Sequence, residues 1–203
     1  MNGVGWAGIG FLAGSFPTGY VMGRLLKGVD IRTVGSGNVG ATNVFRSVGK
    51  TAGLTTLLID MAKGFFPVWW ALRGAPAEAV PLIVGAAAVA GHTWSPWVRF
   101  RGGKGVATSG GVFLALLPGP TGVALTTFAV VFALSRRVSV GSLAAAVALP
   151  VAAGLSGVPG PRLAMAILLG GVVVARHIPN IKRLWRGEEP PLFGPKRGES
   201  KPL

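Results

Sequence analysis

Residues 91–108 read GHTWSPWVRFRGGKGVAT and join two strongly apolar segments, so they mark a point where a membrane-embedded chain meets water. Within this stretch, Lys104 is surrounded by Gly102, Gly103 and Gly105. Glycines let backbone N–H groups approach an anion closely, and the lysine adds a positive charge. Residues 106–117 have a helical pattern, and the N-terminus of that helix would face the same anion. The stretch predicts a phosphate-binding loop at a membrane surface; the alternative is a basic turn that only fixes membrane topology.

The composition is that of an integral membrane protein. Half of the 203 residues are hydrophobic and 13% are charged, whereas soluble domains carry about 25% charged residues. Apolar runs recur along the whole chain, which predicts an all-α polytopic integral membrane protein rather than a globular domain with one anchor. The sequence contains no cysteine, which excludes disulfide scaffolds and thiolate metal sites. The N-terminus lacks the basic region of a secretory signal, so its apolar segment is expected to remain as the first span.

The positive charge is concentrated in a few segments. The formal net charge is +14, and 17 of the 20 Lys and Arg residues fall in residues 24–50, 99–104, 136–137 and 176–201. This bias toward alternate loops is the positive-inside pattern of membrane proteins. It explains the charge without a nucleic-acid partner.

We expect seven transmembrane helices, with the N-terminus outside and the C-terminus in the cytoplasm. They are predicted at residues 3–25, 51–72, 79–94, 106–118, 121–135, 139–155 and 162–176. Pro17 is expected to kink the first helix, and the PGPT sequence of residues 118–121 to form a tight outer turn. Residues 1–189 would form a single membrane-embedded domain, and residues 190–203 a flexible cytoplasmic tail.

A second polar stretch, residues 35–46, reads GSGNVGATNVFR. It places hydroxyl and amide side chains among glycines: Ser36, Gly37, Asn38, Gly40, Thr42 and Asn43. Arg46, at its end, can bind a phosphate through two parallel hydrogen bonds. These groups favour a binding role, and the alternative is a surface loop capped by its Asn residues. A dinucleotide-binding fold is excluded because no strand–helix–strand unit surrounds the glycines.

A third motif, residues 176–189, reads RHIPNIKRLWRGEE and follows the last predicted span. His177, Asn180 and Arg183 are three positions apart, so one helical turn would present them together. A lone His at a helix end is otherwise a cap or an interfacial residue.

Within the second predicted span, Asp60 and Lys63 share a helix face, and each would lower the free-energy cost of burying the other's charge in lipid. These two residues could be functional charges or a structural ion pair, and the sequence does not distinguish between the two.

In this topology all three motifs lie on the cytoplasmic face, which favours a single site built from them. ATP-driven chemistry is not expected there. The lysine loop departs from the GxxxxGK[ST] pattern, since Val98 and Gly105 stand where that pattern requires glycine and Ser or Thr.

Two further kinds of site are also excluded. Soluble-type acyltransferases use an Asp five residues after a catalytic His, but here Trp97 follows His92 and Lys182 follows His177 at that spacing. Six acidic residues offer few ligands for a magnesium site. We therefore expect a site that binds anions without a metal or a cofactor.

The three motifs together resemble those of the bacterial acyl-phosphate:glycerol-3-phosphate acyltransferase family (PlsY). That family transfers a fatty acyl group from acyl-phosphate to the 1-hydroxyl of sn-glycerol 3-phosphate. The resemblance implies lysophosphatidic acid and phosphate as products, in phospholipid biosynthesis. It also implies a multi-pass protein of the bacterial cytoplasmic (inner) membrane whose active site faces the cytoplasm. The expected partners are glycerol 3-phosphate, long-chain acyl-phosphate and membrane lipid; we expect a monomer, and no nucleic acid.

The resemblance also assigns roles to individual residues. Ser36 and Arg46 match positions required for activity, His177 and Asn180 match active residues, and Glu189 matches a residue tied to structural integrity. With the lysine, the candidate catalytic residues are Ser36, Arg46, Lys104, His177 and Asn180. The candidate substrate-binding residues are Gly37, Asn38, Gly40, Thr42, Asn43, His92, Gly102, Gly103, Gly105, Thr108 and Ser142. The candidate structural residues are Asp60, Lys63 and Glu189, and no metal ligand is expected.

Acyl-phosphate is an activated mixed anhydride, so orientation and charge stabilisation should supply most of the acceleration. Lys104, Arg46 and loop amides would neutralise the two phosphates, and either the departing phosphate or His177 would accept the hydroxyl proton. Two rival classes are an anion transporter and a structural lipid-binding protein. The first should show a polar midplane path and an internal repeat, and the second leaves Ser36 and His177 unexplained.

Overall fold

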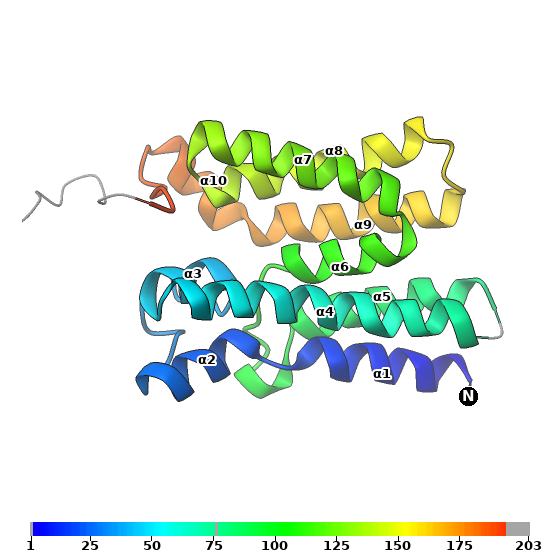
Figure 1. The fold of residues 1–203 in the computed structure, drawn as a ribbon, viewed down its shortest axis with the longest axis horizontal. Coiled ribbons are helices and arrows are strands. Elements are labelled where there is room, and N and C mark those ends of the chain that lie inside the picture. Colours follow the sequence, from blue (N-terminus) through cyan, green and yellow to red (C-terminus); the bar gives the residue numbers. More distant parts are fainter. Residues whose placement is uncertain (1, 76, 194–203) are drawn as a thin grey trace, which may run out of the picture.

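The computed structural model describes residues 2–75 and 77–193, and all regular secondary structure in these ranges is helical (Figure 1). The α-helices are α1 (Gly3–Ser15), α2 (Thr18–Lys27), α3 (Ala41–Ser47), α4 (Lys50–Gly74), α5 (Ala79–Thr93), α6 (Val106–Leu116), α7 (Pro118–Ser135), α8 (Val138–Leu155), α9 (Gly160–Arg176) and α10 (Ile178–Trp185). A 3₁₀ turn, η1 (Pro96–Val98), lies between α5 and α6. The expected all-α class is confirmed for the described residues.

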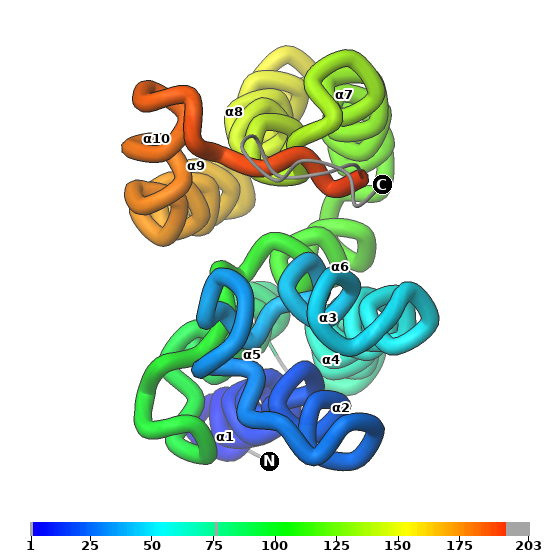
Figure 2. The backbone as a smooth tube through the Cα atoms, turned by 90° about the vertical axis from the view of Figure 1, so that its left-hand side faces the viewer, coloured from blue at the N-terminus to red at the C-terminus, as the bar shows by residue number. Residues whose placement is uncertain are grey.

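The helices fall into two groups that lie side by side (Figure 2). Helices α1 to α5 form one group, α7 to α10 form the other, and α6 lies between them. The short helices α3 and α10 lie at the same end of the bundle (Figure 1). We call this end the motif end, because α3 belongs to the first sequence motif and α10 to the third.

Small residues allow the helices of the first group to pack closely. A Cβ atom on Gly14 would lie 2.0 Å from the carbonyl oxygen of Ala88, and one on Gly10 would lie 2.4 Å from that of Val84. Only glycine at these positions lets the backbone of α1 approach that of α5 so closely, as is common between membrane helices. The main core then fills with apolar side chains, among them Trp6, Val68, Val84, Val112 and Phe113.

The first predicted span is divided into two helices. Helix α1 ends at Ser15 and α2 begins at Thr18, so the break lies at Phe16 and Pro17. Proline lacks an N–H group and its ring clashes with the preceding turn, which ends α1 here rather than only bending it. The break exposes the backbone carbonyl of Phe16 to other partners.

Residues 118–121, expected to form an outer turn, are instead the first turn of α7. Pro118 begins this helix, where a missing N–H group costs no intrahelical hydrogen bond. The chain reverses one residue earlier, at Leu117, whose φ of −142° and ψ of 63° are not helical.

By length and hydropathy, two described helices, α7 and α8, can cross a membrane. Helices α9 and α10 meet at 55°, and this pair would be a third span if its two parts act together. Many large apolar side chains also face outward, including Leu12, Leu54, Trp70, Leu134 and Leu155. Apolar surface of this extent is typical of a membrane-facing bundle.

Candidate active site

The three sequence motifs are linked by polar contacts at the motif end. The Nζ atom of Lys104 donates a hydrogen bond to Oδ1 of Asn180, which joins the loop before α6 to α10. Arg176, the last residue of α9, donates from NH2 to the carbonyl oxygen of Gly102 at 3.2 Å. From α3, Arg46 reaches the chain that follows α10. Residues far apart in the sequence therefore form one polar site.

Glu189 is the buried centre of this site, with 6% of its surface exposed. Its Oε1 atom accepts hydrogen bonds from Ser139 Oγ and Asn180 Nδ2, each at 2.7 Å, and its Oε2 atom accepts one from Arg183 Nε at 2.7 Å. Burial alone would raise the pKa of Glu189, but these three hydrogen bonds lower the pKa below its ordinary value. The carboxylate is therefore ionised at neutral pH, and it fixes the Asn180 amide with Oδ1 toward Lys104.

Lys104 carries a positive charge that no carboxylate in the described part of the chain neutralises directly. Among the described residues it forms no ion pair, and its hydrogen-bond partner is the neutral amide of Asn180. Burial lowers the pKa of Lys104 to about 8, the nearby arginines act in the same direction, and Glu189 acts against them. A partly buried cation beside other cations is an arrangement that favours binding of an anion.

The glycines beside Lys104 pack directly on the end of α5. The N–H of Gly102 donates to the carbonyl of Thr93 at 3.2 Å, and the N–H of Gly103 donates to that of His92 at 3.1 Å. A Cβ atom on Gly102 would lie 2.0 Å from the His92 carbonyl oxygen, and one on Gly103 would lie 2.1 Å from Nε2 of His92. Packing therefore requires both glycines. Their amides are already bonded to the end of α5, so they do not form the anion-binding backbone that the sequence predicted for them.

Asn43 holds the loop of the first motif together. It is 3% exposed, and its Nδ2 atom donates to the carbonyl oxygens of Ile31, Val34 and Asn38 at 2.9–3.0 Å. Its Oδ1 atom accepts the N–H of Ser36 at 2.9 Å. These hydrogen bonds of Asn43 all go to the backbone of the loop. The bond to the N–H of Ser36 holds this exposed residue in place.

The rest of this loop has its own local restraints. Oδ1 of Asn38 accepts the N–H of Gly40 at 2.7 Å, so this amide too is bonded within the loop. Gly37 has a φ of +70°, in the left-handed region that favours glycine. Thr42 is half-buried in the first turn of α3.

His177 lies at the junction of α9 and α10 and is 3% exposed. Its Nδ1 atom is 2.8 Å from the carbonyl oxygen of Val173. A carbonyl only accepts hydrogen bonds, so Nδ1 carries the proton and Nε2 is the basic nitrogen of the neutral ring. Burial lowers the pKa of His177 to about 4, and the charge of Lys104 acts in the same direction. The ring is therefore neutral at pH 7 and a weak base.

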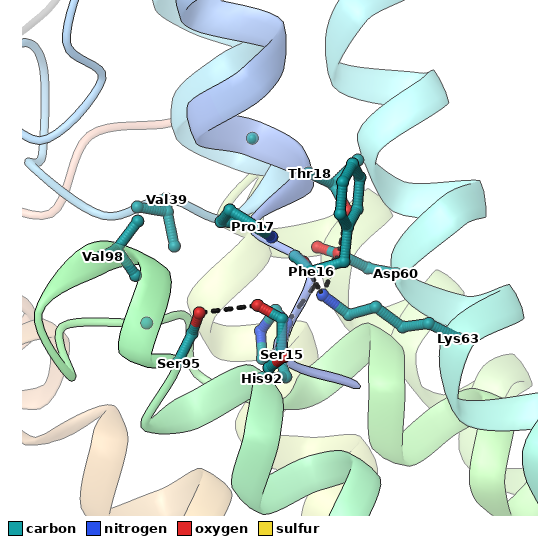
Figure 3. Close-up of a pocket in the computed structure, with 12 residues that line it drawn as sticks. Ser15, Phe16, Pro17, Thr18, Val39, Asp60, Lys63, His92, Ser95 and Val98 are labelled. Atoms are coloured by element: carbon teal, nitrogen blue, oxygen red, sulfur yellow. Dashed lines mark hydrogen bonds and ion pairs between the residues drawn. The ribbon is translucent and has the colours of Figure 1, made fainter. Parts of the chain in front are cut away.

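Asp60 and Lys63 lie away from this site, in a buried cluster at the break between α1 and α2 (Figure 3). Lys63 Nζ is 2.8 Å from Oδ1 of Asp60 and donates to the carbonyl oxygen of Phe16 at 2.8 Å. Thr18 Oγ1 donates to the same Asp60 oxygen at 2.9 Å, and Nδ1 of His92 lies 3.8 Å from it. Lys63 thus gives the Phe16 carbonyl a second partner in the helix break, beside the N–H of Thr18. The pair also borders the His92 side chain, on which Gly103 packs.

The structure brings together some of the sequence-predicted residues and separates others. Arg46, Lys104, Asn180 and Glu189 belong to the linked site. His92, Thr108 and Asn43 are buried in the protein instead: Thr108 is fully buried, where α6 lies against Gly64 of α4. Ser142 is buried in α8, one turn beyond Ser139.

Two arginines of the site were not singled out from the sequence. Arg137 donates from Nε to the backbone carbonyl of Glu189 at 2.9 Å. Arg176 binds the Gly102 carbonyl, and its Nε atom is buried without a hydrogen-bond partner among the described residues. In the sequence, both look like residues that only mark the basic side of the membrane. Nothing in a single sequence separates these arginines from the other loop cations.

Comparison with known sequences gives consistent matches over nearly the whole chain. The model of the glycerol-3-phosphate acyltransferase family matches residues 4–187. A glycerol-3-phosphate acyltransferase of Anaeromyxobacter dehalogenans (strain 2CP-C) is 49% identical over 188 residues, covering 89% of this chain and 92% of the relative. One from Endomicrobium trichonymphae is 44% identical over 176 residues, covering 87% of this chain and 88% of the relative.

Comparison with solved structures identifies the same fold. The crystal structure of PlsY (YgiH), an integral membrane glycerol 3-phosphate acyltransferase, in its glycerol 3-phosphate form matches with a TM-score of 0.90 and 38% identity, over 95% of this chain and 96% of that one. Its lysophosphatidic acid form matches with a TM-score of 0.87 and 37% identity, over 95% of each chain. These matches confirm the family resemblance: the chain belongs to the glycerol-3-phosphate acyltransferase family.

Proposed function

We propose that this protein transfers a fatty acyl group from acyl-phosphate to the 1-hydroxyl of glycerol 3-phosphate. The products are 1-acylglycerol 3-phosphate, which is lysophosphatidic acid, and inorganic phosphate. The observation that carries this function is the link from Lys104 through Asn180 to Glu189, with Arg46 and Arg176 beside it. It is a cation-rich polar site at one end of an apolar bundle. The names of the relatives and of the matching structures agree with it.

The two substrates each carry a phosphate, and the site offers cations for both. Lys104 and the N-terminus of α6 would bind one phosphate. Arg46 would bind the other through its Nε and NH1 donors, which have no partner among the described residues. Ser36 and Thr42 would donate hydrogen bonds to the acyl-phosphate headgroup and to the oxyanion that develops on its carbonyl. Asn180, fixed by Glu189, would orient Lys104 and the glycerol phosphate.

In the reaction the 1-hydroxyl oxygen forms a bond to the acyl carbon, and the bond from that carbon to the phosphate oxygen breaks. The hydroxyl proton goes to the departing phosphate. A buried imidazole with a pKa of about 4 is a weaker base than a phosphate whose second pKa is about 6. We therefore assign His177 to orienting the substrate rather than to accepting the proton.

The location of the enzyme follows from the same proposal. Seven membrane crossings of residues 1–189 with the motif end in the cytoplasm would give the site access to soluble glycerol 3-phosphate. The acyl chain would lie in an apolar groove between helices, open to the bilayer. We propose a monomeric protein of the bacterial inner membrane, with no metal or cofactor at the site.

The test is acyl transfer by the purified protein, with palmitoyl-phosphate and radiolabelled glycerol 3-phosphate. Acyl-CoA and acyl-carrier protein serve as rival donors. We expect label in lysophosphatidic acid, and release of phosphate, with palmitoyl-phosphate alone. Label from a rival donor alone would change the donor assignment. If no donor gives product, the proposed function is wrong, and anion flux into liposomes becomes the next measurement.

A further inference from the structure

The chain that follows α10 crosses the motif end from α10 to α7 (Figure 2). We call residues 188–193 the C-terminal strap. It leaves α10, passes the end of α8 and ends beside α7. These residues include the beginning of the tail that was expected to be flexible, and the rest of that tail, residues 194–203, lies outside the described residues. The four residues after Glu189 are held by specific contacts.

The strap is anchored at its far end on both groups of helices. The N–H of Leu192 donates to the carbonyl oxygen of Arg136, at the end of α7, at 2.8 Å. The Phe193 ring lies 5.7 Å from that of Phe45 in α3, edge to face, and 6.4 Å from that of Phe132 in α7. Phe193 therefore connects α3 of the first helix group with α7 of the second. Aromatic pairs at these separations attract beyond their simple burial.

The middle of the strap holds Arg46. Its NH2 atom donates to the carbonyl oxygens of Pro190 and Pro191, at 3.1 Å and 3.0 Å. A guanidinium has five N–H donors, and both donors of NH2 are used here. Within residues 2–75 and 77–193 the donors of Nε and NH1 have no hydrogen-bond partner, so they can serve an anion. Each proline fixes its own φ, and Pro191 also restricts ψ of Pro190, so the Pro190 carbonyl has a limited range of orientations.

We propose that the strap is a positioning element for Arg46, and that its Phe193 anchor sets where the guanidinium meets the substrate phosphate. This inference rests on the proposed function of the site. Arg46 is an exposed residue with a long side chain, so without the strap it would sample many rotamers. Held by two carbonyls, the guanidinium presents its remaining Nε–H and NH1–H donors in one orientation, from which each can donate separately to a phosphate oxygen.

The first test is Phe193→Ala, assayed for kcat and KM with each substrate in turn. We expect kcat/KM to fall roughly tenfold or more, because small displacements of a positioning group have large effects on rate. Phe193 is 53% exposed, so the midpoint of thermal unfolding should change little. Phe193→Tyr keeps the ring and should restore activity. Trp185→Ala is the matched control: it removes an aromatic ring that is 90% exposed on α10, and it should leave the kinetics unchanged.

The second test links the strap to Arg46 itself. Arg46→Lys replaces the guanidinium, with its several fixed donors, by one ammonium group, and in the wild-type background it should lower kcat/KM strongly. In the Phe193→Ala background the same change should cost much less, because the guanidinium is already misplaced. Independent, multiplicative effects would overturn the inference, as would a Phe193→Ala protein with wild-type kinetics. If Phe193→Ala is unstable, Phe132→Ala replaces it as the test, because it removes the α7 ring that Phe193 contacts. The same fall in kcat/KM is expected, and wild-type kinetics would overturn the inference.

The two proposals fail in different ways. A wild-type protein that transfers no acyl group contradicts the proposed function. A wild-type protein that transfers the acyl group, together with an equally active Phe193→Ala protein, contradicts only the role of the strap.

Discussion

The ammonium group of Lys104 binds Oδ1 of Asn180, a residue 76 positions later in the chain. Asn180 in turn donates to Glu189 at 2.7 Å. A neutral amide thus separates the lysine from the buried carboxylate. If Glu189 paired with Lys104 directly, the two charges would cancel and a substrate phosphate would gain little. The amide fixes the lysine in position while its charge stays available to an anion.

Replacing this lysine should remove most of the activity. Lys104→Met keeps a long unbranched side chain without the charge, and we expect kcat to fall roughly 10²- to 10³-fold, as when one stabilising donor of a transition state is lost. Acyl transfer from palmitoyl-phosphate measures the effect. Lys182→Met, an exposed lysine on α10, is the control and should stay within twofold of the wild type. Equal effects in the two variants would contradict a specific role for Lys104.

Activity should decline as the pH rises through the pKa of Lys104, which burial lowers to about 8. Below this pH the ammonium group binds phosphate, and above it the neutral amine does not. We expect kcat/KM for glycerol 3-phosphate to fall above about pH 8 in the wild type. In Lys104→Arg the guanidinium keeps its charge, so the residual activity should show no decline in this range.

Unfolding does not explain this decline, because the linkage has the opposite sign. The pKa of Lys104 is lower in the folded protein than its ordinary value of 10.5. The folded state therefore binds its proton less tightly than the unfolded state does. Between pH 8 and 10.5 this group makes the folded protein more stable as the pH rises. Thermal unfolding over the same pH range separates loss of charge from loss of structure.

The glycines beside Lys104 should not tolerate a side chain. A Cβ atom on Gly103 would lie 2.1 Å from the His92 ring, and we expect Gly103→Ala to destabilise the protein by about 1–3 kcal/mol, as overpacking does. The loop would shift with it, so acyl transfer should fall as well. Gly110→Ala in α6 is the matched control, since a Cβ there meets nothing within 4 Å. A stable, active Gly103→Ala protein would show that the loop does not depend on this packing.

The all-helical class and the family could be predicted from the sequence, because hydropathy and residue type are local properties. The hydrogen-bond partners of the motif residues could not be predicted. Asn43 looks like a ligand-binding amide in the sequence, yet its side chain is used by loop carbonyls. Backbone carbonyls carry no sequence signal. For the same reason, the contact of Arg46 with the carbonyl of Pro190, which is 144 positions away, could not be predicted.

Two differences in the fold have local causes. Pro17 was expected to bend a continuous helix, but α1 ends at Ser15 and α2 begins at Thr18. Lys63, from α4, donates to the carbonyl of Phe16 in this break. The sequence PGPT at residues 118–121 contains two prolines and a glycine, which is equally typical of a turn and of a first helical turn. Only the neighbouring helices decide between them.

Breaking the buried Asp60–Lys63 pair should be far more costly than breaking a pair near the surface. Asp60 and Lys63 are 3% and 9% exposed, and either Asp60→Asn or Lys63→Met would leave a buried charge unpaired, at a cost of about 3–5 kcal/mol. The double variant removes both charges, so it should recover much of that loss. Asp30→Asn makes the same chemical change where the ion-pair partners are Arg24 and Arg32, both more exposed than Lys63, and it should cost less than either buried single variant. Thermal unfolding in detergent measures all four variants. A double variant no more stable than the single variants would contradict this account and mean that the pair stabilises the protein through more than its own two charges. Its contact with His92, on which the glycine loop packs, would then be the interaction to test next.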